Sequence, residues 1–373
     1  MGAGSGQLHE DYAVSSQLLE NQTIFSTMKT KYILAASILT LLSASAHAQI
    51  SLSTVTIGNP GNADDTTGFG GVGYTYNIGT YEVTLNQYTS FLNAVAATDT
   101  YGLYTTSFAT SGFIAGIARN GASGSFSYSV IGDGNRPAAA VNWFNAARFT
   151  NWLSNGQPAG LQTAATTEDG TYTMNGAWGP LNPLYVISKN ANATVWIPTE
   201  NEWYKAAYYD PSLNSGAGGY WLYPTRSNST PGNVVGSGAN LANFKNNGLY
   251  CVTQSSALIG TQNYLTPVGA FTNSASAYGT FDQGGNKFEW NDSAFDINDP
   301  ITGDLEAIGR GLRGGEWNFP EFGMQSSYQY MNDEASPGYG FRVAGVATVP
   351  EPGSFALLGL GTLLLAARRR RRA

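Results

Sequence analysis

The stretch FDQGGNKFEWND, residues 281–292, gathers the residue types best suited to chemistry in this chain. Its acids, Asp282, Glu289 and Asp292, surround a Gly-Gly pair and a lysine. Calcium takes about six to eight hard oxygen ligands at flexible geometry, and a glycine turn can point backbone carbonyls inward beside carboxylates. The stretch is therefore a candidate cation site. The simpler alternative is a tight turn with solvent-exposed acids.

The histidine and cysteine inventory excludes several kinds of site. The chain has two histidines, His9 and His47, and one cysteine, Cys251. Both histidines lie in segments that we expect to be removed, so the mature core contains none. A Ser-His-Asp triad, a histidine-ligated zinc or iron centre and an intrachain disulfide are then impossible. The cysteine is either a small buried apolar residue or a reactive thiol.

The N-terminal segment predicts export. Residues 28–48 have the three-part layout of a secretory signal peptide, with two lysines, an apolar run over residues 33–42 and an A-x-A pattern ending at Ala48. The mature chain would begin at Gln49. Residues 1–27 are expected to be an upstream extension from a misassigned start codon. The alternative for residues 28–48 is a buried helix.

The C-terminal segment, residues 348–373, is typical of a sorting signal. A Pro-Glu-Pro break precedes an apolar run over residues 354–367 and five arginines at 368–372. The apolar run is shorter than the roughly 20 residues of a comfortable transmembrane helix, and the arginines favour the cytoplasmic side. The segment resembles a PEP-CTERM tail, which an exosortase-type sorting enzyme recognises. The alternative is a plain tail anchor, and either one predicts an exported protein handled at the membrane.

Charge and length limit the partners of the core. The whole chain has a formal net charge of −7, and removing both ends takes away more basic than acidic residues. The core, residues 49–347, is therefore more acidic than the whole chain, which argues against nucleic-acid binding and permits a cation ligand. About 300 residues with no tandem repeat and no linker predict one domain.

The core composition favours short strands and long ordered loops over a helical bundle. It is rich in Gly, Asn, Ser, Thr and aromatic residues, and only 12% of the chain is charged. Three helices are nevertheless predicted by capping signals at Thr84, Asn142 and Thr199. The remainder, from Asp210 to Val346, is predicted to form loops and brief strands.

Six blocks of the core resemble a known family in the family's own order. They are YEVTLNQYTSFL, AVNWFNAARFTNWL, WIPTENEWYKAA, YGTFDQGGNKFEW, LRGGEWNF and YGFRVA. They are similar to successive blocks of the sulfatase-modifying factor family, whose founding members are the formylglycine-generating enzymes, and the similarity runs from about Tyr81 to Ala344. The resemblance implies a single mixed α+β domain of the C-type-lectin-like kind, with little regular secondary structure and bound calcium.

The resemblance also implies which residues hold calcium. Carried over by position, the first site uses the side chains of Asp282 and Glu289 and the carbonyls of Gly285 and Lys287, and the second uses the side chain of Asn240 and the carbonyl of Leu241. The remaining ligands of the second site cannot be aligned. The exposed-acid turn described above stays the alternative for the first.

One departure from the family concerns copper. The formylglycine-generating enzymes bind copper through two cysteine thiolates, which are soft ligands suited to Cu(I). Position matching places Phe319 and Met324 at those two positions. A single thioether does not make a two-coordinate copper site, so we do not expect copper. Other branches of the superfamily use histidine-bound iron, which the core also lacks.

The region that remains suits recognition of a peptide or a glycan. The predicted ligand pocket consists of Arg313, Glu316, Trp317, Tyr328 and Arg342. Trp317 is alternatively a core aromatic residue, and Arg342 alternatively pairs with a buried carboxylate.

Two functional hypotheses follow. The first is an exported, calcium-stabilised binding or structural module of a Gram-negative bacterium, anchored transiently in the membrane and then placed in the cell envelope or extracellular matrix. The second is a formylglycine-generating oxidoreductase acting on protein cysteine, or a divergent relative of one.

Overall fold

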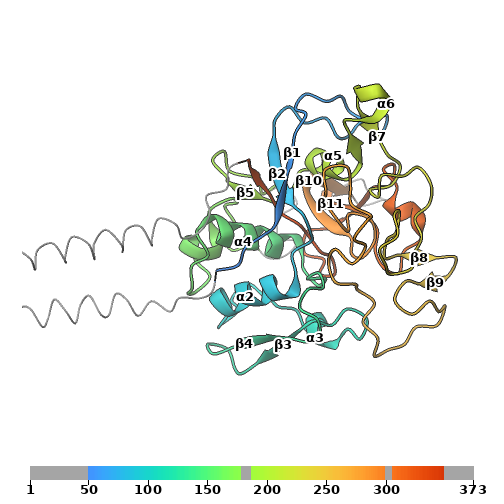
Figure 1. Ribbon diagram of the computed structural model, residues 1–373. Coiled ribbons are helices and arrows are strands. Elements are labelled where there is room, and N and C mark those ends of the chain that lie inside the picture. Colours follow the sequence, from blue (N-terminus) through green and yellow to red (C-terminus); the bar gives the residue numbers. More distant parts are fainter. Residues whose placement is uncertain (1–48, 178–185, 299–304, 348–373) are drawn as a thin grey trace, which may run out of the picture. The chain divides into compact units, whose positions relative to one another are not determined.

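The computed structural model describes residues 49–177, 186–298 and 305–347 (Figure 1). Its first sheet is antiparallel and has the order β1-β2-β13-β5. The strands are β1 (Thr54–Ile57), β2 (Tyr76–Gly79), β13 (Ala344–Val346) and β5 (Val195–Trp196). Strand β13, from the C-terminal part of the described chain, therefore lies inside the sheet, where Ala344 is opposite Ile78 on one side and Trp196 on the other.

The three predicted helices are confirmed, together with their capping residues. They are α2 (Leu85–Val95), α4 (Trp143–Ser154) and α5 (Glu200–Tyr208). Thr84 and Thr199 each close a capping box, and the Asn142 side chain accepts from the backbone N–H of Asn145. Such caps satisfy N–H groups that the first helical turn leaves unpaired.

Helices α2 and α4 pack side by side through aromatic side chains (Figure 1). Phe91 of α2 lies with its ring centroid 5.3 Å from those of both Phe149 and Trp152 of α4. All three are buried. Burying each such side chain stabilises the fold by about 1.5–3 kcal/mol, so this contact holds α2 against α4.

The second sheet corrects the expectation that residues 210–346 form only loops and brief strands. It consists of β10 (Glu289–Asn298), β11 (Leu305–Arg313) and β12 (Tyr330–Asp333), all antiparallel. The register of β10 against β11 shifts between Trp290 and Ala294. A bulge of this kind breaks the alternation of apolar and polar residues by which a strand is recognised.

The other elements are short. They are α3 (Ser107–Thr110), β3 (Ile117–Asn120), β4 (Ser127–Val130), a π-helical turn (Ala164–Glu168), β6 (Tyr209–Asp210), α6 (Leu213–Gly216), β7 (Gly219–Tyr220), β8 (Lys245–Asn246), β9 (Leu249–Tyr250) and a 3₁₀ turn (Glu321–Met324). The predicted fold class, a mixed α+β domain with little regular secondary structure, is confirmed.

The predicted signal peptide, residues 28–48, and the predicted tail, residues 348–373, lie outside the described residues. Within the described ranges, no helix has the length and apolar character needed to cross a membrane.

Candidate functional site

The predicted site residue Arg342 forms a fully buried ion pair with Glu289. Its Nε and Nη2 each donate to one Glu289 oxygen at 2.6 Å, and the indole N–H of Trp203 donates to the same carboxylate at 2.8 Å. The remaining guanidinium N–H groups donate to the carbonyls of Gly79 and Phe281, each at 2.9 Å. Arg342 is therefore a structural residue that joins β2 to the turn before β10, as the buried-carboxylate alternative predicted.

The turn before β10 brings the four residues predicted for the first calcium site into one segment. The Asp282 carboxylate accepts from the N–H of Gly269 at 2.6 Å, and burial raises the pKa of Asp282 to about 6 although Gly269 and Arg342 oppose the shift. Gly285 and Lys287 are both buried. Among the backbone hydrogen bonds outside helices and strands in the described residues, none ends on the carbonyl of Gly285 or Lys287.

The donor set of this turn consists of oxygen atoms and fits a hard cation such as calcium. The Glu289 carboxylate already forms an ion pair with Arg342. In the described part of the chain, no three His, Cys, Asp or Glu side chains are grouped as a ready metal site. A cation would therefore depend on the backbone carbonyls as well as on the carboxylates, as the resemblance implies.

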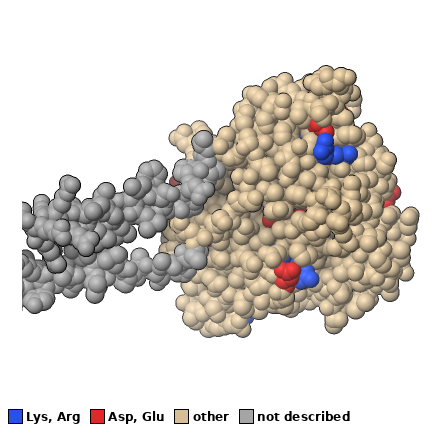
Figure 2. All heavy atoms as spheres, viewed as in Figure 1, with Lys and Arg blue, Asp and Glu red and all other residues tan. Residues whose placement is uncertain are grey.

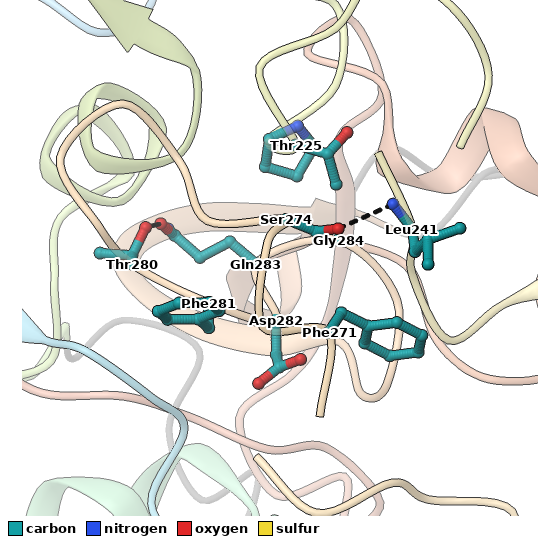
Figure 3. Close-up of a pocket in the computed structure, with 10 residues that line it drawn as sticks. Thr225, Leu241, Phe271, Ser274, Thr280, Phe281, Asp282, Gln283 and Gly284 are labelled. Carbon is teal, nitrogen blue, oxygen red and sulfur yellow. Dashed lines mark hydrogen bonds between the residues drawn. The ribbon is translucent and has the colours of Figure 1, made fainter. Parts of the chain in front are cut away.

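Asn240 and Leu241, predicted for the second calcium site, belong to a loop beside this turn. The side-chain oxygen of Asn240 accepts from the hydroxyl of Thr225 at 2.6 Å. The side-chain amide of Asn240 donates to the backbone carbonyl of Ser229 at 3.1 Å. Leu241 and Asp282 line the same cavity, of about 10 Å³, close to the room that one water needs (Figure 3). The structure thus brings one residue from each predicted site to a common cavity.

Three of the five residues of the predicted ligand pocket, Arg313, Trp317 and Arg342, are buried. Arg313 is buried and donates to Glu200 and to the carbonyl of Ser326. Trp317 is buried, with its ring centroid 4.8 Å from that of Tyr264. These two, like Arg342, contribute to the core because burial of a large side chain or a paired guanidinium leaves no face for a ligand. Glu316 and Tyr328 remain partly exposed.

Tyr328 belongs to a group of rings at the surface that pack edge-on or tilted against one another. We call Phe319, Phe322, Tyr328 and Tyr330 the aromatic face. Phe322 lies 5.2 Å from Phe319 and 5.4 Å from Tyr328 between ring centroids, and the buried Phe288 lies 5.7 Å beneath Tyr330. Phe322 is 43% exposed and Tyr330 is 39% exposed. Rings left this open to solvent in a contiguous group are typical of a recognition surface.

An ion pair borders the aromatic face. The buried Lys287, which precedes Phe288, donates through its ammonium to Glu316. The ammonium also lies 5.8 Å from the centre of the Tyr339 ring. Because the two charges neutralise each other, this edge of the aromatic face has no net charge.

The two positions matched to the copper ligands of the formylglycine-generating enzymes hold an aromatic ring and a buried thioether. Phe319 is part of the aromatic face, and Met324 is fully buried against Tyr223 and Phe244. Sequence reasoning did not single out Phe322, whose exposure depends on the turn at residues 321–324, nor Glu82, which is described below.

The cysteine is expected to be unreactive. Cys251 is a buried free thiol, and burial raises its pKa to about 12. Since the thiolate is the reactive form, we expect a chromogenic disulfide reagent at pH 8 to label the native chain far more slowly than the chain in 6 M guanidinium (an about hundredfold difference or more). Native labelling at the rate of an exposed thiol would contradict this burial.

Comparison with known proteins agrees with the fold and the blocks described above. Residues 72–347 match the sulfatase-modifying factor enzyme 1-like domain, and residues 348–372 match the PEP-CTERM protein-sorting motif. The core is thus a sulfatase-modifying-factor type of α+β domain followed by a sorting signal. Because the first match covers most of the chain, the protein belongs to the sulfatase-modifying factor family. No curated protein is significantly similar to it.

Three solved structures are similar over most of their length. CarF is 19% identical, with 80% of this chain and 99% of CarF covered and a TM-score of 0.45. Variable protein 1 of Treponema denticola is 18% identical, with 80% and 97% covered and a TM-score of 0.43. PvdO from Pseudomonas aeruginosa is 17% identical, with 80% and 92% covered and a TM-score of 0.38. At these values they carry no information about what this chain binds.

The sorting motif has a consequence for location. A PEP-CTERM motif marks a protein of Gram-negative bacteria that is exported and processed at its membrane-held C-terminus, and exosortase-type enzymes recognise it.

Proposed function

We propose that this exported protein is a calcium-stabilised binding module whose aromatic face recognises a glycan in the cell envelope or extracellular matrix. The observation that carries the proposal is the exposure of two rings of the aromatic face, Phe322 packed on Phe319 and Tyr328, and Tyr330 packed on the buried Phe288. Sugar rings present apolar C–H faces, and flat aromatic side chains offer the matching surface.

Charge favours a glycan over a charged peptide as the ligand. Lys287 and Glu316 neutralise each other beside the rings, so this pair offers no free charge to a charged side chain. Figure 2 shows that Lys, Arg, Asp and Glu are also sparse on the face of the molecule it displays. A weakly charged surface suits polyhydroxylated ligands, which bind through stacking and hydrogen bonds.

The test is affinity electrophoresis of the full chain through gels containing dextran, xylan or alginate. We expect at least one of these polysaccharides to retard the wild-type chain. The double variant Phe322→Ala/Tyr330→Ala should lose about 30-fold or more in affinity, because aromatic anchors at binding surfaces each contribute more than about 1 kcal/mol. Both side chains are exposed, so the variant should keep its fold.

A matched double variant controls for the loss of exposed apolar surface. Leu161→Ala/Ile131→Ala removes side chains that are also exposed, from the loops after α4 and β4. It should migrate as the wild type does. Equal losses in both double variants, or no retardation of the wild type by any polysaccharide while a peptide library is bound, would contradict the glycan proposal.

Calcium is proposed as a stabiliser of the turn before β10. The support is the carbonyls of Gly285 and Lys287 beside the carboxylates of Asp282 and Glu289. When bound, the cation would neutralise buried carboxylate charge, and binding to the native state alone stabilises it by mass action. We propose no role for copper, because Phe319 and Met324 supply no thiolate.

The formylglycine-generating alternative is supported by family membership alone. Conversion of a sulfatase-type cysteine peptide to an aldehyde by the full chain with copper and oxygen would establish it.

A further inference from the structure

A cavity of about 220 Å³ is lined by the segment Ser51–Ser53 and by the start of α2, where Thr84 and Gln87 contribute. Ser51 and Ser53 are exposed, so a molecule in solution can reach it. A cavity of about 150 Å³ is enough to hold benzene. This cavity therefore has room for a six-membered ring that carries substituents.

One lining residue, Glu82, has a buried carboxyl oxygen with no partner. Glu82 is 2% exposed. Its Oε2 accepts from the side-chain amide of Asn286 at 3.0 Å, whereas Oε1 has no hydrogen-bond partner in the described part of the chain. Leaving a buried polar atom unpaired is unfavourable. The missing hydrogen bond thus belongs to a residue that a molecule in the cavity would touch.

Other polar side chains of the lining already have partners within the protein. The hydroxyls of Ser53 and Thr80 lie 2.9 Å apart. The side-chain amide of Gln87 donates to the carbonyl of Ser51 at 3.0 Å, and Thr84 and Gln87 close the capping box of α2. These bonds fix the walls in advance, and a preformed site loses less conformational freedom when it binds.

The remainder of the lining is largely apolar. Leu52, Val83 and Val343 are aliphatic, and Tyr81 is aromatic. The ring of Tyr81 is stacked on Phe281, with 5.5 Å between centroids and 28° between planes. Apolar and aromatic walls with a few polar groups are typical of a site for a small molecule.

This lining does not suit a metal ion. Asp282 lines a different cavity (Figure 3), and both oxygens of Glu289 accept from Arg342. In the described ranges, no three acidic side chains are grouped so that they could hold a metal. Burial, and then the charges of Glu289 and Asp282, raise the pKa of Glu82 well above its ordinary value. A neutral carboxyl group has an O–H to donate, and a neutral oxygen atom is the matching acceptor.

We infer that this cavity binds one pyranose ring of a neutral sugar, which packs against Tyr81 and accepts a hydrogen bond from Oε1 of Glu82. The C–H faces of a pyranose suit the aromatic wall, and its oxygen atoms suit the acid. The inference goes beyond the proposed function, because the cavity shares no residue with the aromatic face. The competing explanation is that Glu82 is a buried acid with no ligand.

The test is the melting temperature of the full chain with glucose, galactose or N-acetylglucosamine, each at up to about 100 mM. Binding to the native state raises the melting temperature by mass action. Sorbitol, which has no ring, controls for the general stabilising effect of polyols. We expect at least one of the three sugars to raise the melting temperature more than sorbitol does.

Two substitutions of Glu82 test its role as a donor. Glu82→Gln keeps the shape of the side chain and can donate from its amide, so the affinity for the sugar should stay within about threefold of the wild type. Glu82→Met has no donor, and the affinity should fall about tenfold. Equal affinities in these two variants would contradict a hydrogen bond from Glu82.

Two exposed positions test where the sugar binds and leave the core unchanged. Ser51→Trp places a large side chain at the cavity and should abolish the rise in melting temperature that the sugar causes. Ser123→Trp, at an exposed position of the turn between β3 and β4, should keep that rise.

The outcomes separate this inference from the proposed function. If no sugar exceeds sorbitol, or if Ser51→Trp responds as the wild type does, the cavity is not a sugar site. If Phe322→Ala/Tyr330→Ala loses the response and Ser51→Trp keeps it, the sugar binds at the aromatic face, so the proposed function stands and this inference is wrong. The reverse result supports the cavity, whatever polysaccharide gels show for the aromatic face.

Discussion

Replacing Arg342 with methionine is expected to lower the free energy of unfolding by about 3–5 kcal/mol, because breaking a buried ion pair strands an unpaired charge. The Glu289 carboxylate is fully buried and would keep only its hydrogen bond from Trp203. The Asp282 carboxylate would also lose the nearby guanidinium, which lowers its pKa. The carbonyls of Gly79 and Phe281 would also lose their donors. The measurement is urea unfolding at pH 7 in chelator.

The same substitution at an exposed pair provides the control. Arg226 pairs with Asp210 at 3.4 Å, and its side chain is 52% exposed. Arg226→Met should change stability by only about 0–1 kcal/mol, because surface ion pairs contribute little. If Arg342→Met were no more destabilising than Arg226→Met, the buried pair would not be what joins β2 to the turn before β10.

Gly285→Ala is expected to lower the free energy of unfolding by about 3 kcal/mol or more, combining backbone strain and overpacking. Gly285 has φ +81°, a conformation that favours glycine. A Cβ atom there would lie 2.2 Å from the carbonyl oxygen of Asn243, which already accepts from the N–H of Asn286 at 2.7 Å. The backbone at residue 285 would have to move away from the backbone at Asn243, and the proposed carbonyl ligands would be displaced.

Gly279→Ala separates the effect of backbone strain from the effect of overpacking. Gly279 also has a positive φ, +89°, but its nearest neighbour would be a methyl group of Val55 at an ordinary 3.8 Å. This variant should lose only about 1 kcal/mol, the cost of the backbone conformation alone. Thermal and urea unfolding of both variants would measure the difference, and equal losses would show that the close approach to Asn243 is unimportant.

The helices could be predicted from the sequence because their signals are local. The capping boxes at Thr84 and Thr199 lie within four residues of the helices they begin, and the apolar face of α2 repeats at helical spacing. The pairing of β10 with β11 could not be predicted in the same way. A bulge interrupts its pattern, and its partners are fixed by tertiary contacts rather than by neighbours in sequence.

In the candidate site, too, local signals could be predicted from the sequence and tertiary contacts could not. The Gly-Gly turn and its carboxylates are visible in one short stretch, so the family resemblance could place them. The partner of Arg342 is 53 residues away, and the amide that orients Glu82 is 204 residues away. Nothing in the sequence distinguishes an arginine that binds a ligand from one that neutralises a buried acid, because both require the same side chain.

The position of β13 bears on how the protein matures. The strand lies between β2 and β5. The side-chain amide of Asn77 donates to the carbonyls of Val346 and Ala347. A polypeptide that crosses a membrane N-terminus first delivers β13 last. In a core exported in that way, the sheet would close and Arg342 would reach Glu289 only after translocation of the core. Completion of folding would then be coupled to completion of secretion.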